Sequence, residues 1–412
     1  MDYQQGNLNR RKFISQSITG MASLSLLPIM KQAESIANLT KTKSEIIYRT
    51  LGKTGIKIPV VSMGAMMTND PALIRRACEI GIRHFDTAAT YRGGRNEEMI
   101  GKVIKELNIR DQVYIATKIP RIPPLVLAQM DIEQIKTSLL NQFARCLERL
   151  QSDYVDILHL HDADCAEYLK NAGLRSALET IKRQNKAHFI GFSTHARMIE
   201  CLNEAALDGF YDVVLTAFNY SMCENKELIK AMEQAAAKGI GLIAMKTQCQ
   251  QPWFREYEPF DDERFYQGQI MHTALLKWVL RHDFIATAIP GVQNFQELEQ
   301  DFSVVRDLNY TAKEKQFLQD RNVKLGMASL CQQCYQCVLT CPKNVEIPKL
   351  IRSHTYATCY KNFDQARITL NEMPEGRGIV ACSICNRCTA KCVYHVDIVR
   401  RIDELKTMKL VC

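Results

Sequence analysis

From Tyr48 onward, the chain alternates between short apolar runs and longer stretches in which apolar residues recur every three or four positions. The short runs are rich in β-branched residues and nearly continuously apolar, which indicates strands buried on both faces of a sheet. The longer stretches have the periodicity of amphipathic helices, for example at 97–107, 131–150, 176–184, 226–238 and 271–280. The predicted strands are VVSMG (60–64), RHFDTA (83–88), VYIATKI (113–119), YVDILHLH (154–161), HFIGFST (188–194), DVVLTAFN (212–219), GIGLIAMK (239–246) and IATAIPG (285–291).

Strict alternation of strand and helix predicts parallel strands, and eight such units fit a (β/α)8 TIM barrel. Such a barrel needs about 250 residues, which the chain from Tyr48 to about Tyr310 supplies. An open doubly wound sheet is disfavoured because GGRNEEMIG (93–101) lacks the glycine spacing of a dinucleotide-binding turn. The predicted fold class is α/β, with a barrel at 46–320 and a small, mostly helical domain at 326–412.

Composition is that of a globular protein, with 46% hydrophobic and 24% charged residues among 412. This length exceeds one ordinary core, in agreement with a barrel plus an appended domain. The formal net charge of +8 is spread through helical stretches, which argues against nucleic acid as a partner. No stretch offers the ~18 apolar residues that a transmembrane helix requires.

Two cysteine runs, CQQCYQCVLTC (331–341) and CSICNRCTAKC (382–392), share the spacing C-x2-C-x2-C-x3-C and repeat after 51 residues. The repeat continues beyond the thiols, where VEI (345–347) matches VDI (396–398). Three thiols so spaced suit three corners of a [4Fe-4S] cluster, and the fourth thiol of each run reaches the other cluster in two-cluster ferredoxins. We therefore expect two clusters, one held by Cys331, Cys334, Cys337 and Cys392, the other by Cys382, Cys385, Cys388 and Cys341.

Zinc is the main alternative to an iron–sulfur cluster as the metal bound by these thiols. Zinc sites, however, usually combine two separated C-x2-C knuckles in one tetrahedron. Disulfides between such close cysteines would close short, strained loops. Helices predicted within 345–372 make the module resemble a helical ferredoxin domain. The clusters would carry electrons to an electron-transfer protein or fasten the small domain to the barrel, and the sequence leaves both roles open.

The N-terminus contains Arg10 and Arg11, a weakly apolar stretch at 17–30, and a small-x-small site at 35–37. This arrangement resembles a twin-arginine export signal over residues 1–37. A protein that acquires a metal cofactor in the cytoplasm has to be exported already folded, so we expect a periplasmic protein. A cytoplasmic location is the alternative, because paired arginines are common in basic N-termini.

Polar residues follow three consecutive predicted strands at the barrel end where reacting groups lie. Asp86 lies near the end of the second strand with Tyr91 just beyond it, Lys118 lies at the end of the third, and His161 ends the fourth. A phenol with a pKa near 10 needs a nearby cation to favour its phenolate, which Lys118 would supply while Asp86 holds the lysine. His161 would hydrogen-bond a substrate oxygen. Each residue alone also suits an ordinary role as cap, core aromatic, solvated strand end or barrel histidine.

Five segments together resemble the aldo/keto reductase superfamily over roughly 46–320: DTAATY (86–91), IATK (115–118), DYVDILHLH (153–161), GFST (191–194) and IPG (289–291). The resemblance implies a nicotinamide cofactor, NAD(H) or NADP(H), and a small-molecule substrate whose carbonyl and alcohol forms are interconverted. It implies a catalytic tetrad of Asp86, Tyr91, Lys118 and His161, with Tyr91 as general acid. It also implies cofactor contacts from Ser193 and Asn219 near the nicotinamide and from Gly291, Val292, Gln293 and Asn294 near the adenosine phosphate.

Two departures from the family pattern affect the expected cofactor site. Leu215 stands where a glutamine commonly contacts the nicotinamide, and the loop PGVQNFQELEQD (290–301) lacks a lysine or arginine. Because a 2'-phosphate needs a cation, we expect NAD(H) to be used at least as well as NADP(H).

The sequence thus predicts an oxidoreductase, with an electron-transfer subunit that uses the barrel as a docking scaffold as the alternative. The substrate itself cannot be identified from the sequence. A loop at 248–260 contains aromatic residues that would stack on a sugar or ring if they lined the pocket, namely Trp253, Phe254, Tyr257 and Phe260.

Overall fold

The computed structural model of the protein describes residues 45–248, 270–328, 330–385 and 387–410. The predicted export signal at 1–37 and the aromatic residues of the 248–260 loop, from Trp253 to Phe260, lie outside the described residues. Both therefore stay predictions. Residues Ile46–Cys412 belong to one compact unit. Within the described residues, no helix has the length and apolar character needed to cross a bilayer.

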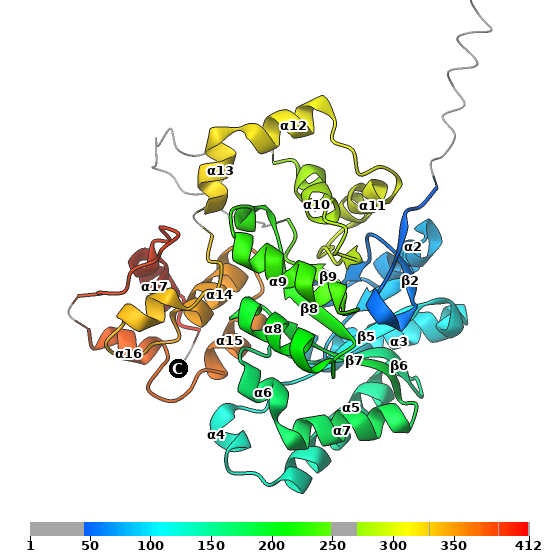
Figure 1. Ribbon diagram of the computed structural model, residues 1–412, viewed down its shortest axis with the longest axis horizontal. Helices are drawn as coiled ribbons and strands as arrows, with labels where there is room; N and C mark the ends of the chain where they lie inside the picture. The colour runs from blue at the N-terminus through cyan, green and yellow to red at the C-terminus, as the bar shows by residue number, and fades with distance from the viewer. Residues whose placement is uncertain (1–44, 249–269, 329, 386, 411–412) are drawn as a thin grey trace, which may run out of the picture. The chain divides into compact units, whose positions relative to one another are not determined.

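Eight parallel strands form the predicted barrel (Figure 1). Each strand pairs with the next one along the chain, and bridges from Val61 to Ala288 and from Gly64 to Gly291 join the last strand to the first. All eight predicted strands are therefore confirmed. They are β3 (Met63–Gly64), β4 (His84–Asp86), β5 (Tyr114–Ile119), β6 (Val155–Leu160), β7 (Ala187–Thr194), β8 (Val213–Ala217), β9 (Gly241–Met245) and β10 (Thr287–Ala288).

Helices follow the strands, and their apolar faces supply much of the main core together with the strands. Several begin at an Asp or Asn whose side chain accepts a backbone N–H of the first turn, as Asp131 does at α5 and Asn225 at α9, which fixes where each helix starts. The five predicted helices are confirmed. The barrel helices are α2 (Pro71–Ile80), α3 (Arg95–Leu107), α4 (Pro124–Leu127), α5 (Ile132–Leu150), α6 (Ala166–Lys170), α7 (Ala172–Arg183), α8 (Met198–Asp208), α9 (Lys226–Ala237), α10 (His272–Leu280) and α11 (Phe295–Ser303).

An antiparallel hairpin of β1 (Tyr48–Thr50) and β2 (Lys57–Pro59) precedes the barrel and was not predicted. Each of its strands has only three residues, too few for a periodic pattern to be recognised. Leu51 and Ile58 pack with the interior residues Ala116, Ile157 and Leu215. The hairpin therefore completes the interior packing of the barrel.

The C-terminal region contains the helices predicted within 345–372, α14 (Ile347–Thr358) and α15 (Phe363–Asn371), followed by α16 (Ile379–Ser383) and α17 (Ile398–Thr407). The 51-residue repeat is visible in the backbone, because α14 and α17 begin at equivalent positions. Asn344 and His395, also 51 residues apart, both have positive φ, 49° and 59°. The two copies pack together in one small core that includes Val345, Val396, Ile351 and Ile402.

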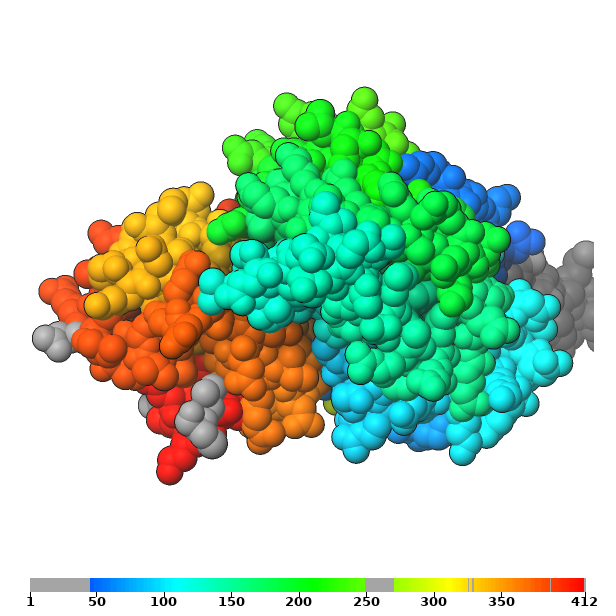
Figure 2. Space-filling view, turned by 90° about the horizontal axis from the view of Figure 1, so that it is seen from below, coloured from blue at the N-terminus to red at the C-terminus, as the bar shows by residue number. Residues whose placement is uncertain are grey.

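Two further helices, α12 (Ala312–Gln319) and α13 (Arg321–Ala328), connect the barrel to this region. Phe317 and Val323 pack there with Tyr220 and Leu275 of the barrel, so the predicted domain start at 326 falls inside a helix. The C-terminal region then lies against the barrel, as its orange atoms do against the green and teal atoms in Figure 2. Buried charges hold this contact, because Arg352 on α14 donates to both carboxylate oxygens of Asp162, at 3.1 and 2.7 Å.

Candidate active site

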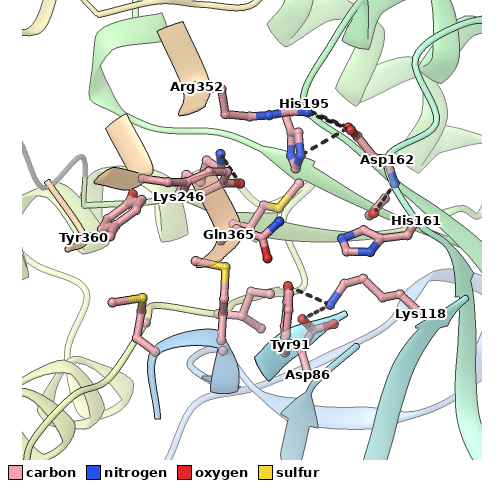
Figure 3. A pocket seen from close by; sticks show the side chains of 18 of the residues that line it. Asp86, Tyr91, Lys118, His161, Asp162, His195, Lys246, Arg352, Tyr360 and Gln365 are labelled. Atoms are coloured by element: carbon pink, nitrogen blue, oxygen red, sulfur yellow. Dashed lines mark hydrogen bonds and ion pairs between the residues drawn. The ribbon is translucent and has the colours of Figure 1, made fainter. Parts of the chain in front are cut away.

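The structure brings the four predicted catalytic residues together at one end of the barrel (Figure 3). Asp86 ends β4, Lys118 lies near the end of β5, and His161 directly follows β6. The Lys118 ammonium donates to Asp86 Oδ1, to the Thr87 carbonyl at 2.7 Å and to the Tyr91 hydroxyl at 3.2 Å. The predicted proximity of phenol and ammonium is therefore confirmed.

His161 lies beside Tyr91, with the two ring centroids 6.0 Å apart and the rings at 79°. Burial, and secondly the charge of Lys118, lower the pKa of His161 to about 3. The imidazole is therefore neutral at physiological pH and can offer a hydrogen bond but no positive charge.

The expected effect of Lys118 on the acidity of Tyr91 is wrong for the protein without ligands. Burial, reinforced by the charge of Asp86 and by Tyr356, raises the pKa of Tyr91 well above its usual value. The prediction considered only the attraction between Lys118 and Tyr91. It ignored the free-energy cost of placing a phenolate in a buried site that already contains a carboxylate. Tyr91 is thus a protonated phenol, able to donate a proton.

The four residues line an open cavity with about 1100 Å³ of empty space, solvent at its mouth included. Of the predicted cofactor residues, Ser193, Gly291 and Gln293 also line it, while Asn219 lines an adjoining cavity shared with His195 and Cys331. These side and main chains lie at the ends of β7, β8 and β10, where an extended dinucleotide would pass the barrel mouth.

Val292 and Asn294 have other roles in the structure. Val292 is 2% exposed within the core, and its carbonyl accepts from Thr68 Oγ1 at 2.8 Å. Asn294 caps α11 by accepting from the Glu297 N–H at 2.9 Å. Leu215 faces the barrel interior beside Ser193, in the register Ser193 to Leu215 between β7 and β8, so the position offers no amide to a nicotinamide.

Sequence reasoning missed much of the cavity wall. Asp162 and Lys246 follow β6 and β9, have positive φ of 55° and 57°, and line the cavity. Lys246 is the last residue of the predicted strand 239–246, and Asp162 directly follows the predicted strand 154–161. Applying the strand-end rule to every strand, extended by one residue, would have identified both. No sequence signal indicated the contribution from α14, α15 and the residues after them, which supply Arg352, Tyr356, Tyr360, Gln365, Thr369 and Glu372.

Asp162 is the centre of a buried charge network beside the tetrad. It accepts from Arg352, and its Oδ1 lies 3.2 Å from His195 Nε2. Burial alone would raise the pKa of Asp162, but the positive charges around it, above all that of Arg352, together outweigh burial and hold this pKa well below its usual value. The carboxylate is therefore charged and fixes both partners at the cavity rim.

None of the eight cysteines of the two runs, all of which are described residues, forms a disulfide bond. Burial and then the nearby Cys331, Cys334 and Cys392 raise the pKa of Cys337 to about 12. Cys382 has Cys341, Cys388 and Cys385 as its thiol neighbours, and burial chiefly raises its pKa to about 11. These neighbours correspond to the two predicted ligand sets, each with one thiol from the other run.

Across the described parts of the chain, no three His, Cys, Asp or Glu side chains converge closely enough to hold a single metal ion. A single zinc at ~2.3 Å from each sulfur would hold its thiolates roughly 3.8 Å apart, whereas a cubane binds each thiolate through a different iron. Cys331 Sγ also accepts from Gln333 Nε2 at 3.2 Å and Cys392 Sγ from the Tyr394 N–H at 3.4 Å. The donors are all thiols and each neighbouring set draws on both runs, an arrangement that two-cluster ferredoxins use.

A parallel eight-stranded barrel with a Tyr, Lys, Asp and His set at its mouth defines a class of hydride-transferring oxidoreductases. The sequence matches the aldo/keto reductase family over residues 65–320. The chain therefore belongs to the aldo/keto reductase family of NAD(P)-dependent oxidoreductases. The matched segment ends before the cysteine runs.

Relatives support this placement, and a solved structure shares the fold. The chain is 26% identical to L-galactose dehydrogenase of Arabidopsis thaliana over 308 residues, covering 67% of this chain and 93% of that protein. It is 24% identical to L-glyceraldehyde 3-phosphate reductase of Escherichia coli over 343 residues, covering 68% and 95%. The holo form of aldo-keto reductase AKR11C1 from Bacillus halodurans shares the fold, with a TM-score of 0.53 at 20% identity over 67% of this chain and 96% of that one.

Glu372, directly after α15, allows a test of the electrostatics of the cavity. Burial, and then the charge of Asp162, raise the pKa of Glu372 to about 7, whereas an unfolded chain ionises this carboxyl near pH 4.3. Between those values the folded state holds more protons, so stability falls as pH rises. We expect Glu372→Gln to be more stable than the parent at pH 8, by roughly 1 to 3 kcal/mol, with little difference at pH 4.

The measurement is the free energy of unfolding by denaturant at both pH values. Glu375→Gln is the matched control, because Glu375 is an exposed carboxyl three residues further on and should show no such pH dependence. A Glu372→Gln effect that is equal at pH 4 and pH 8 would contradict the electrostatic account.

Proposed function

We propose that the protein interconverts the carbonyl and alcohol forms of a small molecule, with Tyr91 as the general acid. The observation that carries this proposal is the contact of 3.2 Å between Lys118 Nζ and the Tyr91 hydroxyl, made while Lys118 is also paired with Asp86. Both groups line the cavity in which two predicted cofactor contacts also lie, Ser193 for the nicotinamide and Gly291 for the adenosine phosphate.

A bound nicotinamide supplies the hydride in the reducing direction and accepts it in the oxidising direction. Tyr91 donates its proton to the carbonyl oxygen as that oxygen gains negative charge. Lys118 hydrogen-bonds the phenolate that remains, and Asp86 holds Lys118 in place. His161, neutral, offers a second hydrogen bond to the same substrate oxygen. In the oxidising direction the phenolate recovers the proton from the alcohol.

Two relatives are named for a sugar and for a sugar phosphate. We extend this to the present chain only as far as the substrate class, a carbonyl compound or alcohol derived from a carbohydrate. The polar lining of the cavity, with Gln248, Thr369 and Glu372 among its side chains, supports a substrate that carries several hydroxyl groups.

Replacing Tyr91 by Phe tests the role of the phenol, because it removes only the proton donor. Turnover should fall by about 10²- to 10⁴-fold, while NADH binding, followed by fluorescence titration, should be unchanged. Tyr114→Phe is the matched control, since Tyr114 begins β5 at the strand end opposite Lys118. Retained turnover in Tyr91→Phe would remove the basis of the enzymatic proposal.

We also propose that NAD(H) is used at least as well as NADP(H). A carboxylate lies against the loop after β10, because Glu297 in the first turn of α11 accepts from the Gln293 N–H at 2.8 Å and from Asn294 Nδ2 at 2.9 Å. A carboxylate in this loop suits a ribose diol and repels a 2'-phosphate. Dissociation constants for NADH and NADPH should be similar or favour NADH, and a tenfold advantage for NADPH would contradict the proposal.

We further propose that the two cysteine runs hold two [4Fe-4S] clusters, on the basis of their spacing and of the thiol neighbours described above. Anaerobically purified protein should contain about eight iron atoms per chain and absorb broadly in the visible range. Cys337→Ser and Cys385→Ser should each lose iron, whereas Cys78→Ser, in the barrel helix α2, should not. Zinc in place of iron would overturn this assignment.

A second candidate function, electron transfer with the barrel as docking scaffold, is favoured by one observation. A single cavity is lined by Asn219, a predicted nicotinamide contact, and by Cys331, a predicted cluster ligand. Iron–sulfur clusters pass single electrons. This function requires no proton donor, so Tyr91→Phe should leave it intact, and bleaching of the visible absorption by NADH alone would support it.

A further inference from the structure

One wall of the catalytic cavity comes from outside the segment that matches the family. That segment ends at residue 320, whereas Arg352, Tyr356, Tyr360, Gln365 and Thr369 lie beyond it and line the cavity with the tetrad. We call α14, α15 and the turn between them the recognition wall. In Figure 3, the wall residue Gln365 projects into the space beside Tyr91 and His161, while Tyr360 lies further to the left.

Contacts on both sides hold the recognition wall in a fixed place. Arg352 binds Asp162 through two hydrogen bonds, and both residues are buried. Tyr356 accepts from Lys246 Nζ at 3.2 Å, and that ammonium also lies 4.8 Å from the Tyr356 ring centre. A side chain on this wall therefore keeps its position relative to Tyr91, which is the requirement for selecting a substrate.

Gln365 is the side chain on this wall best placed to contact a substrate. Its backbone N–H is used by the Asn362 cap of α15 at 3.0 Å. Its side-chain amide makes no hydrogen bond to another residue in the described part of the chain and points into the cavity. The amide offers one acceptor and two donors, a combination that matches a hydroxyl group, which both donates and accepts.

The charges in the cavity favour a neutral ligand group at this position. Among the described lining residues, Lys118 is paired with Asp86, Arg352 with Asp162, and Arg121 with Asp164. Lys246 donates to the hydroxyl of Tyr356, a neutral group. A carboxylate or phosphate would compete with the carboxylates already present in the three ion pairs, whereas a hydroxyl needs only the amide.

We propose that Gln365 is a specificity-determining residue that hydrogen-bonds a hydroxyl beside the reacting carbon, so that the recognition wall selects uncharged polyhydroxylated substrates. This inference rests on the proposed function, since it places the reacting carbon at Tyr91. On this proposal, the recognition wall determines which substrate binds, and the tetrad carries out the reaction. Loss of the amide should therefore affect hydroxylated substrates and spare those that lack the hydroxyl.

The test compares Gln365→Leu with the parent on two substrate classes, neutral sugars with their reduced polyols, and an aromatic aldehyde with no other polar group. For the polyhydroxylated class kcat/KM should fall by roughly 10- to 100-fold. For the aromatic aldehyde it should stay equal or rise, and the NADH dissociation constant should not change. Gln365→Glu, which keeps an acceptor, should retain part of the preference.

Asn371→Leu is the matched control, because Asn371 is an exposed amide at the end of the same helix; it should change neither class. Equal effects of Gln365→Leu on both classes, or no effect on either, would overturn the proposal, as would a parent enzyme that prefers anionic substrates. Failure of the proposed function is distinguishable, because it would appear as unchanged turnover in Tyr91→Phe with every substrate.

Discussion

The burial of one ammonium group organises the mouth of this barrel. Lys118 is 1% exposed, and an unpaired charge at such a site would cost several kcal/mol. Asp86, equally buried, and the Thr87 carbonyl compensate that cost through direct hydrogen bonds. Beneath them, burial and then the charge of Lys118 lower the pKa of His84 to about 3, so the core tolerates the imidazole only as a neutral group. The third hydrogen bond of the same ammonium goes to the Tyr91 hydroxyl. This contact places a positive charge beside the proposed proton donor.

A second buried ion pair joins the C-terminal region to the barrel by the same physical logic. Arg352 and Asp162 are 4% and 6% exposed, so neither charge can be removed without leaving the other buried and unpaired. Because Asp162 directly follows His161, this pair ties the recognition wall to the residue next to the reacting groups. The cavity is therefore a product of both parts of the compact unit and not of the barrel alone.

The sequence predicted the features that follow from a local pattern. It did not predict the contacts that form between segments far apart in the chain. Apolar runs identified the eight strands, and the strand-end rule identified the tetrad. The three-residue strands of the β1–β2 hairpin carry too little pattern, and Gln365 reaches the tetrad only because α15 packs against a barrel mouth more than 200 residues earlier in the chain. The acidity expected for Tyr91 was wrong because burial, which a sequence does not reveal, and then the charge of Asp86 raise the pKa of this phenol.

If the cysteines bind clusters as proposed, metal binding would also affect substrate recognition, because of where the two cysteine runs lie in the chain. The recognition wall lies between the runs, since α14 begins six residues after Cys341 and α15 ends eleven residues before Cys382. Each proposed set takes a thiol from both runs, so each cluster closes a loop that contains the wall. Closing that loop removes conformational freedom from the unfolded chain and stabilises the folded arrangement. Clusters that never contact the substrate would therefore still hold Gln365 beside Tyr91, and a role in recognition is compatible with a role in electron transfer.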